Sequence, residues 1–520
     1  MVGLPEPIEA AANLPWHLTK GIAHFSLWPV RAIMNTSYMP KTPPPKEGES
    51  VYDITQPMFD IAAMVYYYTE LRSSTNHLLE KYAKKFNLST KEIEDIRNAI
   101  VLTEKRLDAL KQLDQADASS SNVAAEYQES LTQLEHIKTR HGLSSGDIEV
   151  FTTYFDILKE PKDATSIKRD LMLYRSFISP TFRAFLGGSD FNEDTIIAMV
   201  DRDPKMYVST IDDDFANKSI AIHKGLGSEL VYAIFVSPEN KRVTVSFRGS
   251  VNIQDWITNT KFFGKMTDLK LPGFTSEKDL VRDERKSYGR VHIGFYDYLF
   301  GKTKKGASGS NISKSEEIMG HLTDLFENKC KGFSLFVTGH SLGGAMSTLF
   351  ATRAATFGKF GKVTNVSFAS PYCGDQGFRD HFYDLEQKGL IRHIRISNEE
   401  DVVPLVLPVA PNLPFIGTNK SGVPLEMYKH TGMNFRMYRS SQPFFPNCRF
   451  FYPKMGSLPN EVQNAVLNNL GLGLSFGLVG KHLCLEYSKR LEDCKDELKK
   501  ISVEDLYADT SITGWSNALM

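Results

Sequence analysis

The sequence predicts an α/β fold in which a mostly parallel central sheet is preceded by a helical N-terminal region. The first observation is a helical spacing of apolar residues over about residues 51–180. The second is an alternation of strand-like and helix-like segments after about residue 205. The third is a small-residue turn at 339–343, directly between a predicted strand and a predicted helix. A length of 520 residues leaves room for two structural units.

Composition and charge exclude several classes of function. Hydrophobic residues make up 41% and charged residues 24%, as in ordinary globular proteins, and a formal net charge of −1 argues against nucleic-acid binding. Five cysteines, few and odd in number, fit free thiols in a reducing compartment. The start MVGLPEPIEA lacks the features of a secretory signal, and no apolar run approaches the ~20 residues of a spanning helix. We therefore expect an intracellular, cytoplasmic protein that is at most peripheral on a membrane.

Residues 1–50 are predicted to be an irregular N-terminal segment that includes the linker-like sequence KTPPPKEG at 41–48. Two of the four tryptophans, Trp16 and Trp28, fall in this segment. Because tryptophan combines an apolar ring with a polar N–H, it suits a boundary between water and lipid. The segment is therefore either a membrane-contacting anchor or a strap packed on the protein's own surface.

Residues 51–204 are predicted to be a helical region that contains a helical hairpin. One apolar stripe recurs at three- and four-residue steps on a charged background, at Ile93, Ile96, Ile100, Leu107 and Leu110. After the polar stretch ADASSSN (116–122), a second stripe follows at Tyr127, Leu131 and Leu134. The hairpin is interpreted as structural packing or a cap on the lid side, with partner binding as the alternative.

Residues 205–495 are predicted to form the α/β domain, followed by a C-terminal tail at 496–520. A helix with the capping-box residues Ser313 and Glu316 is expected from 313 to 326. Strands are expected at 229–236 and 241–249, joined by the turn SPEN, and at 334–338, 363–370 and 391–397. Strand, helix and strand at this rhythm imply parallel pairing with right-handed crossovers.

The turn at 339–343 reads Gly339-His340-Ser341-Leu342-Gly343, the G-x-S-x-G pattern, between the strand SLFVT and a helix that starts at about Gly343. A serine on such a sharp turn is lifted above the sheet, and side chains at the flanking glycines would clash with the neighbouring strand and helix. The pattern predicts an α/β-hydrolase fold and a serine hydrolase whose nucleophile is Ser341.

A nucleophilic serine needs a base and an acid, which follow it in this fold in the order acid and then histidine. Asp401 directly follows the strand at 391–397, where the loops that hold such sites begin, and Asp375 is the runner-up. With Asp401 as the acid, His430 and His482 remain as candidate bases. The residues alone leave both histidines open.

The negatively charged oxygen of an acyl-transfer intermediate needs N–H donors that are already in place. One is expected to be the backbone N–H of Leu342, the residue after the nucleophile. The other is expected from the loop in SFRGSVNIQDW (246–256), where Ser250 offers a backbone N–H and a hydroxyl.

Five blocks together resemble the class 3 (fungal-type) triacylglycerol lipase family. They cover about residues 205–490 in the family's order: FRGS followed by NIQDWITN, VHIGFYDYL (291–299), GHSLGGA, FASPYCGDQGF (368–378) and EDVVPLVLP (400–408). The resemblance implies Ser341 as nucleophile, Asp401 as acid, and Ser250 with Leu342 as the oxyanion hole. It also implies His482 as base, because His482-Leu483 followed by Tyr487 is similar to the family's catalytic histidine segment. The stretch after the oxyanion serine, with Ile253 and Trp256, is implied to be a mobile lid.

The resulting prediction is an esterase that cleaves acylglycerols through an acyl-enzyme, with a lipid substrate at a membrane or lipid-droplet surface. Phospholipid or diacylglycerol is the alternative substrate, and a non-catalytic lipid-binding or scaffolding protein that keeps the fold is the alternative of another class. No cofactor and no metal is implied, because the sequence shows no ligand cluster with metal spacing. The sequence does not identify protein partners.

Overall fold

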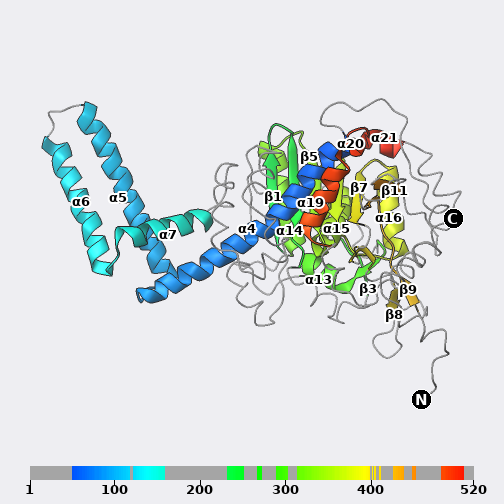
Figure 1. Ribbon diagram of the computed structural model, residues 1–520, viewed down its shortest axis with the longest axis horizontal. Coiled ribbons are helices and arrows are strands. Elements are labelled where there is room, and N and C mark those ends of the chain that lie inside the picture. The colour runs from blue at the N-terminus through cyan, green and yellow to red at the C-terminus, as the bar shows by residue number, and fades with distance from the viewer. Residues whose placement is uncertain are drawn as a thin grey trace, which may run out of the picture. The chain divides into compact units, whose positions relative to one another are not determined.

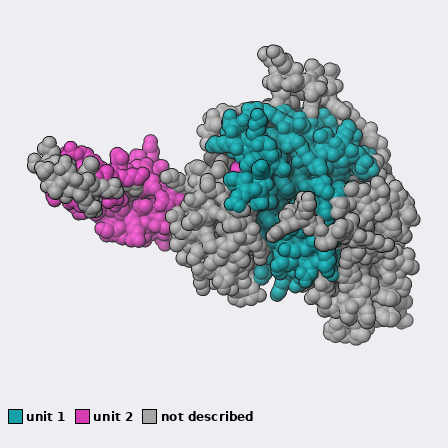
Figure 2. Space-filling view, turned by 90° about the horizontal axis from the view of Figure 1, so that it is seen from above, with its two compact units in different colours: residues 1–63, 184–191, 238–520 teal, residues 64–183, 192–237 magenta. Residues whose placement is uncertain are grey.

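The structure is a computed structural model of the chain, and it forms two compact units. The first comprises residues 1–63, 184–191 and 238–520, and the second comprises 64–183 and 192–237 (Figure 2). The residues described are 50–116, 121–158, 231–250, 266–271, 288–301, 313–398, 401, 403–405, 409–411, 425–438, 448–451 and 482–508. Several predicted features lie outside them: the tryptophan-containing segment before residue 50, the lid candidates Ile253 and Trp256, residues 159–204 of the predicted helical region and residues 509–520 of the predicted tail.

A seven-stranded sheet forms the centre of the α/β fold, in the order β1-β2-β5-β6-β7-β10-β11. Neighbouring strands from β2 to β10 pair in parallel, and β11 pairs antiparallel with β10. The prediction of a mostly parallel sheet is therefore confirmed. The strands are β1 (Tyr232–Ser237), β2 (Arg242–Phe247), β5 (Ser334–His340), β6 (Val363–Phe368), β7 (Ile391–Asn398), β10 (Met433–Met437) and β11 (Cys448–Phe451).

Helices cover the sheet, as the predicted crossovers require (Figure 1). Ser313 and Glu316 form the predicted capping box at the start of α14. The helices are α13 (Ile293–Phe300), α14 (Lys314–Asp324), α15 (Leu342–Phe357), α16 (Gln376–Gln387), α19 (Cys484–Asp493), α20 (Lys495–Leu498) and α21 (Val503–Ala508), with short helical turns at Leu325–Lys329 and Val403–Leu405. Two small antiparallel pairs complete the elements: β3 (Met266–Asp268) with β4 (Arg290–His292), and β8 (Val409–Pro411) with β9 (Leu425–Met427).

The core of the sheet surrounds β5 and the helix that follows it. The alternate strand residues Leu335 and Val337 are fully buried, as are Met346 and Phe350 of α15. A helix whose buried residues lie on nearly all its faces must be enclosed by other elements, and α15 packs against both β5 and β6. The first residue of α15 is therefore held firmly at the carboxyl end of β5.

Four helices lie between residues 51 and 158: α4 (Val51–Lys85), α5 (Thr90–Ala116), α6 (Ser121–His141) and α7 (Ser145–Leu158). Serine side chains cap the starts of α5 and α7, where Ser89 pairs with Glu92 and Ser144 with Asp147. Helices α5 and α6 pack side by side, so the predicted helical hairpin is present (Figure 1). The buried cluster includes the predicted stripe residues Ile93, Ile100 and Leu107.

The first turns of α4 pack within the unit that contains the sheet. Thr338 Oγ1 on β5 donates a hydrogen bond of 3.2 Å to the carbonyl oxygen of Met58, and the rings of Phe59 and Phe368 meet at 5.1 Å. The backbone N–H of Val51 donates to the carbonyl oxygen of Ile501 at 2.8 Å. The start of the helical region thus belongs to the α/β core, and the domain boundaries expected at 50, 204 and 495 stay predictions.

Candidate active site

Ser341 lies on the turn between β5 and α15, as the G-x-S-x-G pattern predicts. Its backbone has φ 60° and ψ −128°, a conformation that L-amino acids rarely adopt. Its N–H donates a hydrogen bond of 2.9 Å to the carbonyl oxygen of Phe368 at the end of β6. The strained turn is therefore held by the neighbouring strand, which keeps the serine in one position.

The glycines of the turn are required by close backbone contacts. A Cβ atom at Gly343 would lie 2.0 Å from the carbonyl oxygen of Phe247, the last residue of β2. A Cβ atom at Gly339 would lie 2.3 Å from the carbonyl oxygen of Gly343. Because backbone atoms cannot move aside cheaply, only glycine fits at these positions. The same contact brings the end of β2 against the turn that carries Ser341.

Asp401 and His482 meet in the folded chain although 81 residues separate them. His482 Nδ1 donates to the carboxylate of Asp401, with distances of 3.0 Å to Oδ1 and 2.9 Å to Oδ2. Both side chains are almost fully buried. A buried carboxylate on Nδ1 places the remaining proton-accepting site of the imidazole on Nε2, as a general base requires.

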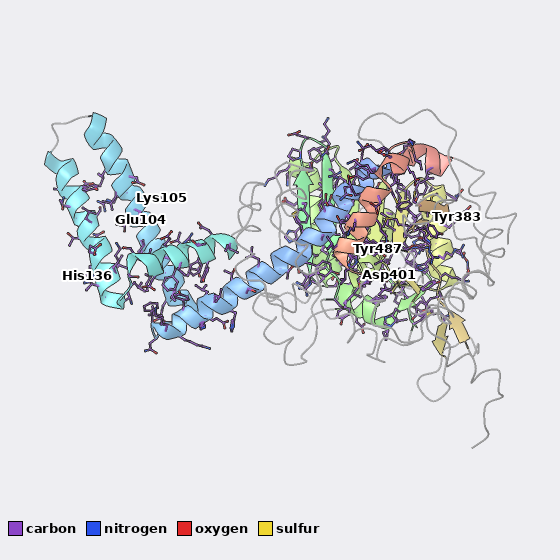
Figure 3. The ribbon with its side chains drawn as sticks, viewed as in Figure 1. Glu104, Lys105, His136, Tyr383, Asp401 and Tyr487 are labelled. Carbon is purple, nitrogen blue, oxygen red and sulfur yellow. The ribbon has the colours of Figure 1, made fainter. Side chains whose placement is uncertain are left out.

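The Asp401 carboxylate is further held by Tyr487 and by the backbone. Tyr487 Oη donates to Asp401 Oδ2 at 2.7 Å, and the N–H of Val403 donates to Oδ1 at 2.9 Å. The N–H of Asn398 in turn donates to Tyr487 Oη at 3.0 Å. Burial and the nearby Asp401 charge raise the pKa of Tyr487 well above its ordinary value, so the phenol stays a donor. Figure 3 labels Tyr487, a residue of α19, and its partner Asp401.

His340 connects the turn that carries Ser341 to the Asp401–His482 pair. Its Nε2 donates a hydrogen bond of 3.0 Å to the carbonyl oxygen of His482, and the two imidazole rings lie 4.7 Å apart. The ring of Tyr487 meets the His340 ring edge-on at 5.5 Å. Burial, with a smaller contribution from His482, lowers the pKa of His340 well below its ordinary value, so this ring is neutral. Because His340 directly precedes Ser341, these contacts tie the turn that carries Ser341 to His482.

The second ring nitrogen of His482 is buried and carries no hydrogen bond to any residue that the structure describes, Ser341 included. A buried polar atom without a partner costs free energy, and such atoms concentrate at functional sites. Catalytic hydrogen bonds are often long in enzymes without substrate and shorten in the reacting complex. Nε2 of His482 is therefore available to accept a proton.

The alternative acid and base have other structural roles. The Asp375 carboxylate caps α16 through the N–H of Phe378 at 2.9 Å and pairs with Arg290 Nε at 3.1 Å. His430 Nε2 donates to the carbonyl oxygen of Pro404 at 2.7 Å, and its ring stacks on Tyr372. The side chain that meets Asp401 is that of His482, so the geometry favours His482 over His430.

The predicted oxyanion donors lie on the two segments that meet at Gly343. Leu342 is the first residue of α15, where backbone N–H groups have no helical partner and face outward from the helix start. Ser250 is half-buried and follows the end of β2 at Phe247 by three residues. Leu342 therefore lies next to Ser341 at the carboxyl edge of the sheet, and Ser250 follows the strand whose last residue, Phe247, contacts the same turn.

Two features of the site do not follow from the sequence pattern. The chain order of the triad excludes His340 as the base, but the structure gives it a packing and hydrogen-bonding role between Ser341 and His482. Tyr487 belongs to the histidine segment of the family resemblance, but the pattern does not reveal its contact with Asp401. Away from this site, the folded chain also brings Cys448, Cys494 and Glu497 together, a grouping that sequence spacing does not show.

Comparison with protein families identifies a match to Lipase (class 3) over residues 244–410. The matched segment contains Ser250, Ser341 and Asp401 and ends before His482. Phospholipase A1-IIgamma of Arabidopsis thaliana is 30% identical over 177 residues, which cover 32% of this chain and 39% of that protein. Secreted mono- and diacylglycerol lipase 1 of Fusarium solani is 26% identical over 199 residues, or 37% of this chain and 48% of that protein.

The chain spans about two fifths of the length of the first curated relatives that it matches. Among solved structures, the Rhizomucor miehei lipase propeptide complex has 20% sequence identity and a TM-score of 0.33, with 49% of this chain and 67% of that chain covered. A triacylglycerol lipase from Penicillium expansum has 19% identity and a TM-score of 0.29, with 40% and 65% covered.

Proposed function

We propose that this chain, whose residues 244–410 match the class 3 lipase family, is a serine hydrolase that cleaves carboxylic ester bonds of lipids through an acyl-enzyme on Ser341. The proposal rests on the buried pair of Asp401 and His482, in which Nε2 of His482 has no hydrogen-bond partner among the described residues. His340, which directly precedes Ser341, is hydrogen-bonded to the backbone of His482. A neutral imidazole oriented by a carboxylate next to a strained serine is the arrangement that activates a hydroxyl for attack.

In the proposed reaction, Ser341 Oγ attacks the ester carbonyl carbon while His482 Nε2 takes the hydroxyl proton. Asp401 stabilises the resulting imidazolium and keeps the proton of Nδ1 in place. The N–H groups of Leu342 and Ser250 bind the negatively charged carbonyl oxygen. His482 then gives its proton to the leaving alcohol, and later removes a proton from the water that releases the fatty acid.

Acylglycerols are the proposed substrates, in line with the mono- and diacylglycerol lipase among the relatives. Phospholipids are the second candidate, because relatives from Arabidopsis thaliana and Oryza sativa are named phospholipases A1. Both classes present the same fatty-acyl ester to the proposed site. They differ in the headgroup, so the choice depends on residues around the acyl site rather than on the triad.

An activity-based probe tests the chemical step directly. The full chain is incubated with a fluorophosphonate and the modified peptide is mapped by mass spectrometry. We expect one adduct on Ser341, absent from Ser341→Ala, while a labelled control serine hydrolase verifies the reagent. A folded protein that shows no adduct on Ser341 would support the scaffolding alternative and reject the proposal.

Fatty-acid release separates the two substrate classes. Purified protein is assayed on emulsified triacylglycerol, on diacylglycerol, and on phosphatidylcholine vesicles, each with Ser341→Ala as the background control. Faster release from acylglycerols supports the first candidate. Faster release from the vesicles, with the fatty acid leaving the first glycerol carbon, supports the phospholipase A1 candidate.

We also propose that the protein is intracellular and acts peripherally on a membrane or lipid droplet. The support is that all five cysteines are buried and none forms a disulfide, a state that a reducing compartment maintains. No helix in the described segments combines the length and the apolar character that crossing a membrane requires. Cell fractionation tests the proposal: salt-releasable protein in the membrane or droplet fraction is expected, and recovery in the culture medium contradicts it.

A further inference from the structure

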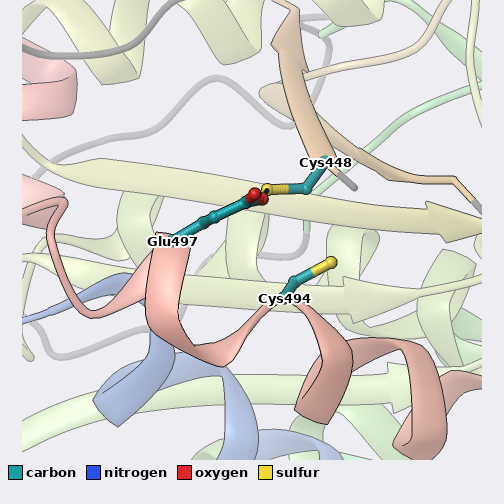
Figure 4. A group of neighbouring side chains, drawn as sticks. All are labelled: Cys448, Cys494 and Glu497. Atoms are coloured by element: carbon teal, nitrogen blue, oxygen red, sulfur yellow. Dashed lines mark hydrogen bonds between the residues drawn. The ribbon is translucent and has the colours of Figure 1, made fainter. Parts of the chain in front are cut away.

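Three side chains with metal-binding atoms lie together away from the proposed catalytic residues. Cys448 is the first residue of the edge strand β11, Cys494 directly follows α19, and Glu497 lies in α20. The two sulfur atoms and a carboxylate oxygen all lie within 4.8 Å of one another (Figure 4). Cys448 Sγ donates a hydrogen bond of 3.0 Å to Glu497 Oε2.

The elements that carry these three residues explain why their side chains lie close together. Cys494 and Glu497 are three residues apart, a spacing that places side chains on the same side of a helical turn. Cys448 approaches from a different element and is 46 residues away from Cys494 along the chain. Both cysteines are almost fully buried, whereas Glu497 is half-buried. Two inner thiols and one outer carboxylate leave a side through which solvent or an ion can enter.

We propose that Cys448, Cys494 and Glu497 bind a zinc ion, an inference that goes beyond the proposed esterase activity. Thiolate and carboxylate ligands together suit Zn²⁺, whereas Ca²⁺ and Mg²⁺ prefer oxygen ligands alone. Tetrahedral bonds of about 2.3 Å to sulfur place two ligand sulfurs roughly 3.8 Å apart, so contraction by about 1 Å or less completes the site. Solvent supplies the fourth ligand on the side of Glu497.

Binding changes protonation but involves no redox step. Two zinc–sulfur bonds and one zinc–oxygen bond form, and the two thiol protons leave to solvent. The Cys448-to-Glu497 hydrogen bond is replaced by the shared ion. The ion then ties β11 to the end of α19, the helix that begins two residues after His482. The proposed role is therefore structural, in holding the segment that carries the histidine.

The test uses cobalt and zinc with the full chain, kept reduced by a phosphine reductant. Co²⁺ bound to thiolates produces a strong near-ultraviolet charge-transfer absorption, which Zn²⁺ should remove by displacement. We expect one equivalent of Co²⁺ to bind, with release of thiol protons to a pH indicator. Cys494→Ser should lower the affinity by roughly 100-fold or more, and Glu497→Gln, which keeps both thiols, by roughly tenfold.

Cys330→Ser is the matched control, because Cys330 is also a buried free thiol but lies outside the cluster. It should leave the cobalt spectrum unchanged. The proposal is overturned if the reduced, folded protein shows no cobalt–thiolate absorption, or if Cys494→Ser binds as well as the parent. It is also overturned if alkylation mapping finds Cys448 and Cys494 joined as a disulfide in protein isolated with its thiols protected. None of these readouts depends on ester hydrolysis.

Discussion

Tyr487 donates a hydrogen bond of 2.7 Å to the same Asp401 oxygen that lies 2.9 Å from His482 Nδ1. The phenol and the imidazole therefore hold one carboxylate from two directions, and the N–H of Val403 holds it from a third. A carboxylate with three donors cannot rotate freely, so it presents a fixed acceptor to the histidine. Tyr487 acts on the proposed reaction through Asp401, as a positioning residue.

Removal of this phenol hydroxyl should therefore affect turnover more than substrate binding. In Tyr487→Phe, we expect kcat to fall by about tenfold with KM little changed, because the loss of one hydrogen bond on a carboxylate corresponds to about 1.4 kcal/mol. The free energy of unfolding should fall by about 1–2 kcal/mol, since the N–H of Asn398 also loses its acceptor. Steady-state kinetics and urea unfolding measure both quantities. An unchanged kcat in a destabilised protein would leave Tyr487 with a structural role alone.

The two candidate acids allow a matched comparison. Asp401→Asn should lower kcat by about 10³–10⁴-fold, because an amide on Nδ1 favours the wrong tautomer of His482. Asp375→Asn should leave kcat within about threefold but lower the free energy of unfolding by about 1–2 kcal/mol, since Asp375 caps α16 and pairs with Arg290. Kinetics and denaturant unfolding of both variants test this, and the reverse result would make Asp375 the acid.

The backbone strain at Ser341 predicts that two inactive variants of this residue differ in stability. Its φ of 60° with ψ −128° is costly for any residue with a Cβ atom, and glycine adopts it without penalty. Ser341→Gly should therefore be more stable than Ser341→Ala by about 1 kcal/mol, after the entropy that glycine adds to the unfolded chain. Both variants should be inactive. Equal stabilities in urea would show that the turn is relaxed.

Alanine substitutions at two helical glycines distinguish the effect of a close backbone contact from that of ordinary helix propensity. Gly343→Ala places a Cβ atom 2.0 Å from the carbonyl oxygen of Phe247, and we expect a loss of about 3 kcal/mol or more with loss of activity. At Gly320, in α14, an added Cβ atom would have no neighbour within 4 Å, so Gly320→Ala should stabilise by up to about 1 kcal/mol. Thermal unfolding of both proteins tests the pair; similar changes in the two variants would contradict the contact.

The nucleophile turn could be predicted because its causes are local in sequence. A buried strand, small residues around Ser341 and an apolar helix follow each other within 24 residues, from Ser334 to Phe357. Each segment is recognisable from the spacing of its apolar residues or from its glycines. The order of the elements and the position of Ser341 between them therefore follow from the pattern.

The base could not be chosen from local pattern, because the choice depends on which side chain crosses space to Asp401. His430 lies closer to Asp401 in sequence, but its ring stacks on Tyr372 and donates to Pro404, whereas His482 reaches the carboxylate. For the same reason, the strand that packs against α4 could not be predicted, because Thr338 and Met58 are 280 residues apart in sequence. Helical periodicity shows that a helix forms but not what covers it.

Three buried histidines predict how stability depends on pH. Burial lowers the pKa values of His340, His393 and His430 well below the ordinary value of 6.5. In the folded protein these rings therefore stay neutral at pH values where the unfolded chain takes up protons. Because the unfolded state binds more protons below about pH 6.5, the free energy of unfolding rises with pH in that range and falls as the pH is lowered.

Each such histidine should contribute up to about 1.4 kcal/mol per pH unit, so the three together predict a slope of up to about 4 kcal/mol per unit below about pH 6. Urea unfolding at several pH values between about 5 and 8 measures this slope, and above about pH 7 the contribution of these rings should be flat. His430→Phe keeps an aromatic ring against Tyr372 and should reduce the slope by about one third. A slope that stays the same in His430→Phe would mean that His430 binds its proton equally in the folded and unfolded states, contrary to its burial.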